Sequence, residues 1–410
     1  MNPVIDGAFA STFQAMRHRN FRLWFVGQLV SLVGTWMQSI AQNWLVYELT
    51  GSAADLGLVN FVGAVPMVLL TLYSGAIADR FEKRLVIFWC QVAMMALAFA
   101  LALLCWTGVV RLWHVLILAF LLGTAMAMDT PARQAFAVEL VGKEDLNNAI
   151  ALNSGIFHGA RVLGPAAAGV LIATSGVAGA FFLNGVSFFA VLIALFLMDV
   201  SLIRRTGGGS DSTKDPLGGV RYLKENRVPR AVVLLISLSS LIAMPYYVLI
   251  PIFAKEILGR GAGAYGVLMS AAGVGSVVGA LFSANPWVGK RKGRTITAAS
   301  LLFPVLLLGF AFCRSYAASI LVLIAVGFAF VLQNAPANSL LQALVPDHLR
   351  GRVLALYVSL LLGLMRVGSL LIGVLAEMTS TPTALAVVAV ASLAAGLWVR
   401  RRYPELRRAR

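Results

Sequence analysis

The sequence is poor in charged residues, which make up 12% of its 410 residues, whereas hydrophobic residues make up 60%. A soluble domain carries roughly 25% charged residues and about 45–50% apolar ones, so this composition excludes an ordinary soluble protein. A helix needs about 20 apolar residues to cross the hydrocarbon core of a bilayer. The chain is long enough for about twelve such crossings joined by short loops.

Motifs of metal-dependent and ATP-driven chemistry are also missing. The three cysteines, Cys90, Cys105 and Cys313, lie in apolar runs and have neither metal-ligand nor disulfide-framework spacing. The sequence contains no His-Glu-x-x-His motif and no Gly-x-x-x-x-Gly-Lys-[Ser/Thr] phosphate loop. We therefore expect no enzyme, no ATP-driven pump, no cofactor and no metal site. The first residues lack the apolar segment of a secretory signal, so we expect no removable signal peptide.

Apolar runs of spanning length recur along the whole chain. Only helices or closed barrels satisfy their backbone hydrogen bonds in lipid, and these runs lack the alternation of barrel strands. The sequence therefore predicts an all-α membrane protein with twelve transmembrane helices. We place these helices at residues 21–47, 55–78, 84–107, 112–132, 146–174, 177–199, 231–254, 263–288, 295–313, 316–340, 353–377 and 383–400.

Basic residues are distributed unevenly over the predicted loops. Lysine and arginine are concentrated in the two tails and in every second loop, while the intervening loops contain only Arg111, Lys255, Arg260 and Arg314. By the positive-inside rule, both termini lie in the cytoplasm of a multi-pass protein of the bacterial inner membrane. A net charge of +16 also suits nucleic acid, but topology explains a side bias at helix ends better. We expect the lipid bilayer, and no nucleic acid, as a partner.

A polar, glycine-containing segment near the midpoint predicts a flexible linker between two halves. The halves resemble each other, and parallel repeats of six spans are typical of two-half transporters. The matched pairs include Pro131 and Pro336, Arg161 and Arg366, and Gly164 and Gly368. We therefore predict two pseudo-symmetric six-helix bundles. The predicted parts are a cytoplasmic N-terminal tail (1–20), an N-terminal bundle (21–200), a cytoplasmic linker (201–229), a C-terminal bundle (230–400) and a basic cytoplasmic tail (401–410).

The first span carries a polar stripe. Its members, spaced three or four residues apart so that they share one helix face, are Gln28, Ser31, Thr35, Gln38 and Gln42. A polar face inside the membrane must contact protein or a water-filled cavity. The stripe therefore predicts substrate-binding side chains lining a cavity, or hydrogen bonds that hold neighbouring helices together.

Two arginines lie inside predicted spans, and each is costly there unless it has a partner or a wet cavity. Arg161 is expected to bind an anionic or strongly polar substrate group, or else to bond neighbouring groups such as Gln38; Arg366 has the same two options. His158, on the same face as Arg161, is either a proton acceptor or a structural residue. Tyr246, in the seventh span, is expected to contact substrate or to anchor the helix at the interface.

A charged cluster is predicted where the second and fourth spans end on the cytoplasmic side. It comprises Asp79, Arg80, Lys83, Arg84, Asp129 and Arg133. Opposite charges on neighbouring helix ends can pair in one conformation and separate in another, which makes a conformational switch. The alternative is that the basic members only signal topology.

The stretch from Gly75 to Arg84 resembles the loop signature G-x-x-x-D-[RK]-x-G-[RK]-[RK] of the major facilitator superfamily, with Glu82 in place of the second glycine. In that family the signature charges pair with an acid at the end of the fourth span, and Asp129 has that position. The segments 36–38, 44–47 and 129–134 resemble its enterobactin-exporter-like, or transmembrane secretion effector, branch. The resemblance covers essentially the whole chain and implies the major facilitator fold and proton-driven export by alternating access.

We therefore predict a secondary active transporter, working as a monomer, that exports a siderophore-like, drug-like or other amphiphilic small molecule by proton-coupled antiport. The alternative is uptake, or lipid-type translocation, of an anionic solute by the same fold. Export has the support of the resemblance and of the Gly-Pro region around Gly164. The two intramembrane arginines suit an anionic solute in either direction.

Overall fold

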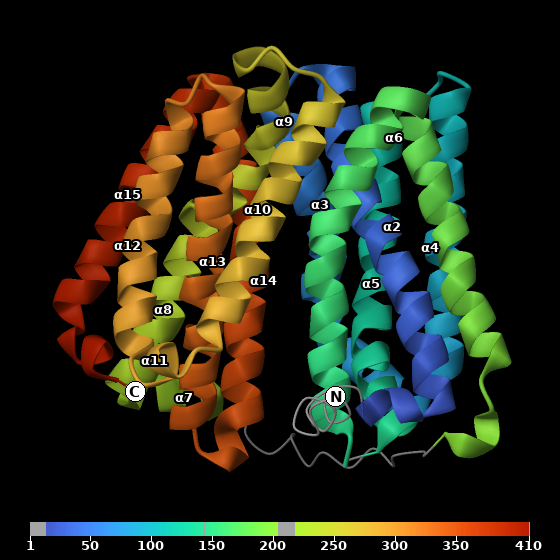
Figure 1. Cartoon of the computed structure of the whole chain (residues 1–410), viewed down its shortest axis with the longest axis horizontal. Coiled ribbons are helices and arrows are strands. Elements are labelled where there is room, and N and C mark those ends of the chain that lie inside the picture. The colour runs from blue at the N-terminus through green and yellow to red at the C-terminus, as the bar shows by residue number, and fades with distance from the viewer. Residues whose placement is uncertain (1–13, 143, 204–217, 410) are drawn as a thin grey trace, which may run out of the picture. The chain divides into compact units, whose positions relative to one another are not determined.

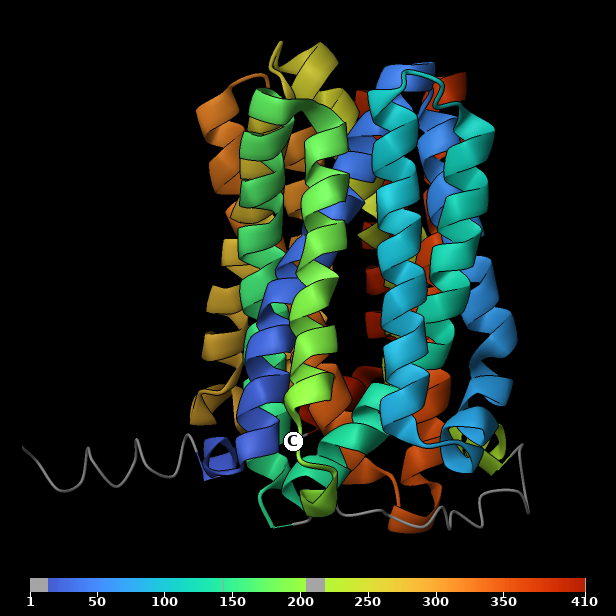
Figure 2. The same ribbon diagram turned by 90° about the vertical axis from the view of Figure 1, so that its right-hand side faces the viewer.

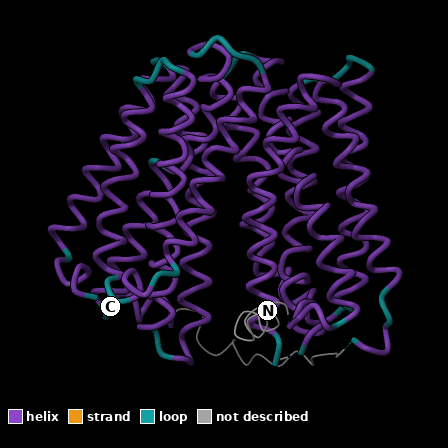
Figure 3. The backbone as a smooth tube through the Cα atoms, in the orientation of Figure 1, coloured by secondary structure: helices purple, strands orange, loops and turns teal. Residues whose placement is uncertain are grey.

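The computed structural model describes residues 14–142, 144–203 and 218–409, without the side chains of residues 68 and 71–80. Helices account for nearly all of this part of the chain, which contains no strand (Figure 3). The first half comprises η1 (Gln14–Arg17), α2 (Arg19–Thr50), α3 (Ala53–Arg80), α4 (Lys83–Trp106), α5 (Leu112–Val141), α6 (Leu146–Leu197) and η2 (Val200–Leu202). The second half comprises α7 (Gly218–Glu225), α8 (Arg227–Ile242), η3 (Met244–Leu249), α9 (Ile250–Ile252), η4 (Phe253–Ile257), α10 (Ala262–Ser283), α11 (Pro286–Gly289), α12 (Lys292–Ala311), α13 (Tyr316–Leu344), α14 (Asp347–Met378), α15 (Thr381–Arg402) and η5 (Pro404–Arg408).

Among the described residues, nine helices are long and apolar enough to cross a membrane. One of them, α6, has 52 residues, and at 1.5 Å per residue it is far longer than a hydrocarbon core of about 30 Å. It therefore supplies two crossings. The helices α2 and α3, with 32 and 28 residues, are long enough for one crossing each. The predicted all-α fold is thus confirmed, and the described helices are long enough to supply the twelve predicted crossings.

The two arms of α6 meet at Gly176, where the backbone leaves the helix with φ 71° and ψ 177°. A positive φ of this kind favours glycine, because a Cβ atom would clash with the backbone. Figure 2 shows the two arms running antiparallel and joined at one end. This turn lies between the predicted fifth and sixth spans, as the sequence predicts.

The seventh span, residues 227–257, is irregular beyond Ile242. Pro245 and Pro251 lie in this stretch, and a proline cannot donate its share of helix hydrogen bonds. The chain passes through the 3₁₀ helix η3 and the π-helical η4. Irregular backbone at membrane depth requires burial in protein, and nearly all residues from Ala243 to Ala254 are buried.

Contacts between residues divide the chain into two compact units. The first contains residues 1–42 and 62–209, and in it α4 packs against α5 and α6. The second contains residues 43–61 and 210–410, and in it α12 lies between α13 and α15 (Figure 1). The end of α2, the start of α3 and the turn between them (residues 43–61, the α2–α3 tip) thus pack with elements of the second half. The bundle boundaries predicted from the sequence remain a prediction.

Candidate functional site

Arg161 lies in the first arm of α6, partly exposed, beside an aromatic pair. Its guanidinium carbon is 5.9 Å from the ring centroid of Trp36 in α2, within the range of a cation–π interaction. Trp36 in turn meets Phe157 edge to face, with centroids 5.7 Å apart. Gly164, one turn after Arg161, allows this approach, because a Cβ atom there would collide with the Cβ atom of Trp36.

His158 lies one turn before Arg161 on the same helix face. Its ring meets Phe157 at 84° with centroids 5.8 Å apart. The Nδ1 atom is buried and has no hydrogen-bond partner in the described part of the chain. Buried nitrogen atoms are nearly always hydrogen-bonded, so this atom is an exception in the described part of the chain.

The polar stripe of α2 serves two purposes. Gln38 is buried and accepts a hydrogen bond of 2.5 Å from Nδ2 of Asn184, in the second arm of α6. The bond joins the first and sixth spans, so Gln38 holds helices together here. Thr35 and Gln42 are partly exposed and remain candidates for binding a solute, although the Thr35 hydroxyl donates to the Ser31 carbonyl at 2.9 Å.

A buried network of charged and polar side chains joins α2, α4 and α5 of the same unit. Asp129 and Arg133 of α5 form an ion pair four residues apart. Asp129 also accepts from Nε2 of Gln91 at 3.2 Å, and Arg133 donates to Oε1 of Gln28 and stacks over Trp24 at 5.8 Å. The predicted switch residues Asp129 and Arg133 are therefore paired with each other, and Gln28 belongs to their network.

The other predicted switch residues meet different partners. Lys83 forms an ion pair of 2.8 Å with Glu139, near the end of α5, and both side chains are mostly buried. Arg84 donates to the Leu195 carbonyl at 3.0 and 2.7 Å. The side chains of Asp79 and Arg80 lie outside the described residues. Sequence reasoning missed Glu139, whose signal is an acid three turns beyond Asp129 on the same helix.

Arg366 is the counterpart of Arg161 in the second unit. Its Nη1 atom donates to Oδ1 of Asn60 in α3 at 3.2 Å and to the Tyr247 hydroxyl at 3.3 Å. Asn60 also donates to Oδ1 of Asn43 at 2.9 Å. Arg366 is thus hydrogen-bonded to the α2–α3 tip. Tyr246 is buried edge-on against the Phe303 ring, and it is Tyr247, beside it, that contacts Arg366.

The carboxylates of Glu256 and Glu377 bind the α2–α3 tip near the turn between the two helices. The Tyr47 hydroxyl donates to Glu256 of η4. Oε2 of Glu377, in α14, accepts from the Ser52 hydroxyl at 3.1 Å and from the Ala53 amide at 3.0 Å. Both carboxylates line a cavity of about 240 Å³. We call these contacts of Glu256 and Glu377 the tip latch. The sequence did not predict the tip latch, because each of the two acids lies at the end of an apolar run and belongs to no recognisable motif.

A model of the transmembrane secretion effector family matches residues 10–408. The chain belongs to this family of the major facilitator superfamily. The chain is 26% identical over 378 residues to the staphyloferrin A transporter of Staphylococcus aureus (strain NCTC 8325 / PS 47), covering 91% of this chain and 93% of the relative. It is 25% identical over 363 residues to the multidrug efflux pump Tap of Mycolicibacterium fortuitum, covering 85% and 87%.

Solved structures agree with this chain in fold. A bacterial homologue of the human lysosomal transporter Spinster matches with a TM-score of 0.72 and 12% identity, covering 95% of this chain and 96% of that one. The major facilitator fold predicted from the sequence is therefore confirmed. The protein is a multi-pass membrane protein of a transporter family. Among its described residues, no group of three or more His, Cys, Asp or Glu side chains is placed to hold a metal ion.

Proposed function

We propose that this protein is a secondary active transporter that exports an amphiphilic, siderophore-like or drug-like small molecule by alternating access in exchange for protons. The supporting observation is that each half carries one arginine within a span, beside an aromatic side chain of the first span of that half: Arg161 with Trp36 and Arg366 with Tyr247. An arginine at mid-membrane costs at least about 2.5–3.5 kcal/mol on insertion scales. We therefore expect each of these two arginines to face a polar solute group or a wet cavity within its own half.

The proposed solute carries an acidic or strongly polar group that Arg161 binds, with its apolar part against Trp36 and Phe157. A planar guanidinium suits such recognition, because it presents several donors in one plane. Phe157 is 45% exposed, so its ring offers an apolar surface to a solute. Thr35 and Gln42, which are partly exposed on α2, would supply further hydrogen bonds.

We propose separately that an acidic solute group also contacts Arg366, and that this contact affects the tip latch. An acidic solute group competes with Asn60 for the guanidinium, because both are acceptors of the same Nη1 donor. Losing Asn60 weakens the attachment of the α2–α3 tip, so a bound solute favours a conformation in which the tip moves. A ligand shifts such an equilibrium only by its differential affinity for the two states, and this competition supplies the difference.

Proton coupling is assigned to His158, whose buried Nδ1 atom is unpartnered in the described part of the chain. Histidine is the side chain whose ordinary pKa lies nearest neutral pH. We place the protein in the bacterial inner membrane as a monomer with both termini in the cytoplasm. The charged pairs Asp129–Arg133 and Lys83–Glu139 are proposed to separate and re-form as the conformation changes.

A second candidate function is uptake, or lipid-type translocation, of an anionic solute, which the two intramembrane guanidiniums favour. One set of assays separates the candidates. A thermal-shift screen of purified protein finds a solute, and accumulation of that solute in intact cells is compared with accumulation in inverted vesicles. Export predicts uptake into inverted vesicles that is driven by an imposed proton gradient. Transport in the opposite direction, or transport without solute-coupled proton flux in proteoliposomes, would contradict proton-coupled export.

A further inference from the structure

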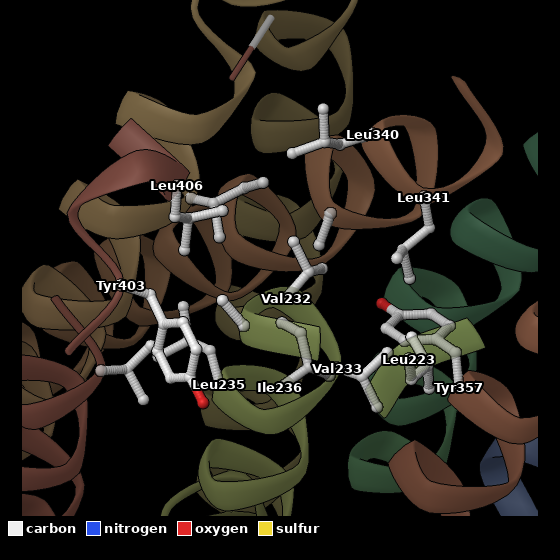
Figure 4. Close-up of a cluster of buried hydrophobic side chains, with 14 of the residues drawn as sticks. Leu223, Val232, Val233, Leu235, Ile236, Leu340, Leu341, Tyr357, Tyr403 and Leu406 are labelled. Atoms are coloured by element: carbon white, nitrogen blue, oxygen red, sulfur yellow. The ribbon is translucent and has the colours of Figure 1, made fainter. Parts of the chain in front are cut away.

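One end of the second unit gathers four chain segments around a shared hydrophobic cluster. The buried side chains of Val232, Ile296, Val399 and Leu406 come from α8, α12, α15 and η5, and Tyr403 joins the last two elements (Figure 4 labels Val232, Tyr403 and Leu406). The Gly293 amide, at the start of α12, donates to the Ala409 carbonyl at 3.2 Å. The C-terminal segment therefore folds back against the beginning of α12.

This folding collects basic side chains from distant parts of the sequence. We call the set the basic collar; its members are Arg227, Arg230, Lys290, Arg291, Lys292, Arg294, Arg400, Arg401, Arg402, Arg407 and Arg408. Within the segments 227–230, 290–294 and 400–408 that carry it, the acidic residue is Glu405, which pairs with Arg227 at 3.0 Å. These three segments therefore provide one carboxylate for eleven positive charges, so they do not neutralise most of the charge of the collar.

Three guanidiniums of the collar surround one aromatic ring. The guanidinium carbons of Arg227, Arg230 and Arg402 lie 6.0, 5.5 and 5.8 Å from the ring centroid of Tyr403. Each contact is within cation–π range of the ring, and Arg227 also pairs with Glu405, but the three positive charges repel one another. A topology signal needs basic residues only on one side of the membrane and does not need them at one point, so the crowding requires a further reason.

The collar lies where α8 and α12 begin and where α15 ends, and the ends of membrane-spanning helices are expected at the lipid headgroups. The adjacent Trp287 is 52% exposed, and the Arg291 guanidinium lies 5.0 Å from its ring centroid. Exposed tryptophan beside arginine is typical of a membrane interface. Clustered Lys and Arg at helix ends attract anionic headgroups. We propose that the basic collar binds the phosphodiester headgroup of an anionic lipid, which relieves the repulsion around Tyr403.

The test uses the purified full chain in detergent, titrated with phosphatidylglycerol or with phosphatidylcholine and followed by thermal shift and native mass spectrometry. The collar variant combines Arg230→Gln, Arg402→Gln and Arg407→Gln. Its matched control combines Arg111→Gln, Arg260→Gln and Arg314→Gln, which removes the same charge at other helix ends. Phosphatidylglycerol is expected to stabilise wild type and control alike, whereas its half-saturating concentration in the collar variant rises at least fivefold.

Three results would overturn the proposal: equal phosphatidylglycerol binding by wild type and collar variant, an equal loss in the control, or an equal thermal shift with soluble glycerol phosphate. The last would identify a site for free phosphates in place of lipid. If the triple variant does not fold, the pair Arg407→Gln and Arg408→Gln, whose side chains are exposed, replaces it. A rise of at least twofold is then expected, and unchanged binding would overturn the proposal equally.

Discussion

Arg161 and Arg366 have matched positions in the two halves but different surroundings. Arg161 lies over the flat face of Trp36, whereas Arg366 donates directed hydrogen bonds to Asn60 and Tyr247. The aromatic neighbour of Arg161 offers a ring face to the guanidinium, while the neighbours of Arg366 offer hydrogen-bond acceptors. We infer that the two halves kept the charge and diverged in its use. In the proposed mechanism, Arg161 is the residue that binds the solute, and Arg366 is the residue that couples binding to the α2–α3 tip.

Removing the Arg161 guanidinium is expected to have the largest effect. A charge-assisted hydrogen bond contributes about 1.5–3 kcal/mol, so Arg161→Ala should lower transport by up to about 100-fold while membrane insertion stays intact. Arg161→Lys should rescue only part of the activity, because lysine lacks the planar fork. Transport in proteoliposomes, with yield and thermal midpoint in detergent as controls for insertion, provides the measurement.

The comparison would fail if Arg161→Ala retained full activity, since Arg161 would then have no part in binding. Trp36→Phe serves as the matched variant, because it keeps an apolar ring face and leaves the charge in place. Its loss of transport should be several times smaller than that of Arg161→Ala. Equal losses would mean that the aromatic contact, and not the charge, dominates this half.

Gly164 follows Arg161, and Gly368 follows Arg366. Substituting these two glycines tests whether the two halves share the same close packing of helices. A Cβ atom at Gly164 would meet Trp36, and one at Gly368 would meet the Leu241 carbonyl, so each glycine packs against the first span of its own half. Overpacking costs about 1–3 kcal/mol, and both Gly164→Ala and Gly368→Ala should lower the thermal midpoint. Gly159→Ala is the control, because a Cβ atom there meets nothing within 4 Å. A lower thermal midpoint in only one of the two variants would show that the two halves do not share this packing.

These residues also mark how far the sequence alone predicts the molecule. Spans, the turn at Gly176 and the paired arginines follow from apolar length and repetition, which are properties of the chain itself. Partners across spans, such as Asn60 for Arg366 or Glu139 for Lys83, depend on how each helix is rotated about its axis. No local pattern encodes that rotation, so the stripe on α2 left two alternatives open. The structure then placed Gln38 in an interhelix bond and left Thr35 partly exposed.

Asn60→Ala isolates the coupling role of Arg366 without removing its charge. The substitution deletes the acceptor that a solute must displace, and a hydrogen bond to a charged group contributes about 1.5 kcal/mol, or roughly tenfold in affinity. An acidic solute should therefore bind about tenfold more tightly to this variant in a detergent binding assay. Asn334→Ala is the control, since Nδ2 of Asn334 donates within its own helix, to the Phe330 carbonyl at 2.8 Å. Weaker solute binding in Asn60→Ala would show that Asn60 and the solute do not compete for Arg366.

Tyr47→Phe should give the smallest effect, because it removes one bond of the tip latch and leaves the others. Glu256 is exposed, so water replaces the lost donor and the net cost stays near 0.5 kcal/mol, which is about two- to threefold. Trp44 remains stacked on Tyr265, and Glu377 still accepts from the Ala53 amide. The measurement is the alkylation rate of a cysteine introduced as Ala54→Cys, after the natural cysteines have been replaced by serine.

Tyr222→Phe supplies the control for this last measurement, since it also deletes a hydroxyl donor in the second unit, one that bonds the Leu344 carbonyl at 2.9 Å. It should leave the alkylation rate at Ala54→Cys unchanged, because the lost bond does not touch the tip. If both tyrosine variants speed alkylation equally, the change reflects a general loosening of the unit. If neither does, the Tyr47–Glu256 bond has no part in holding the tip, and the coupling from Arg366 must act through Asn60 and Glu377 alone.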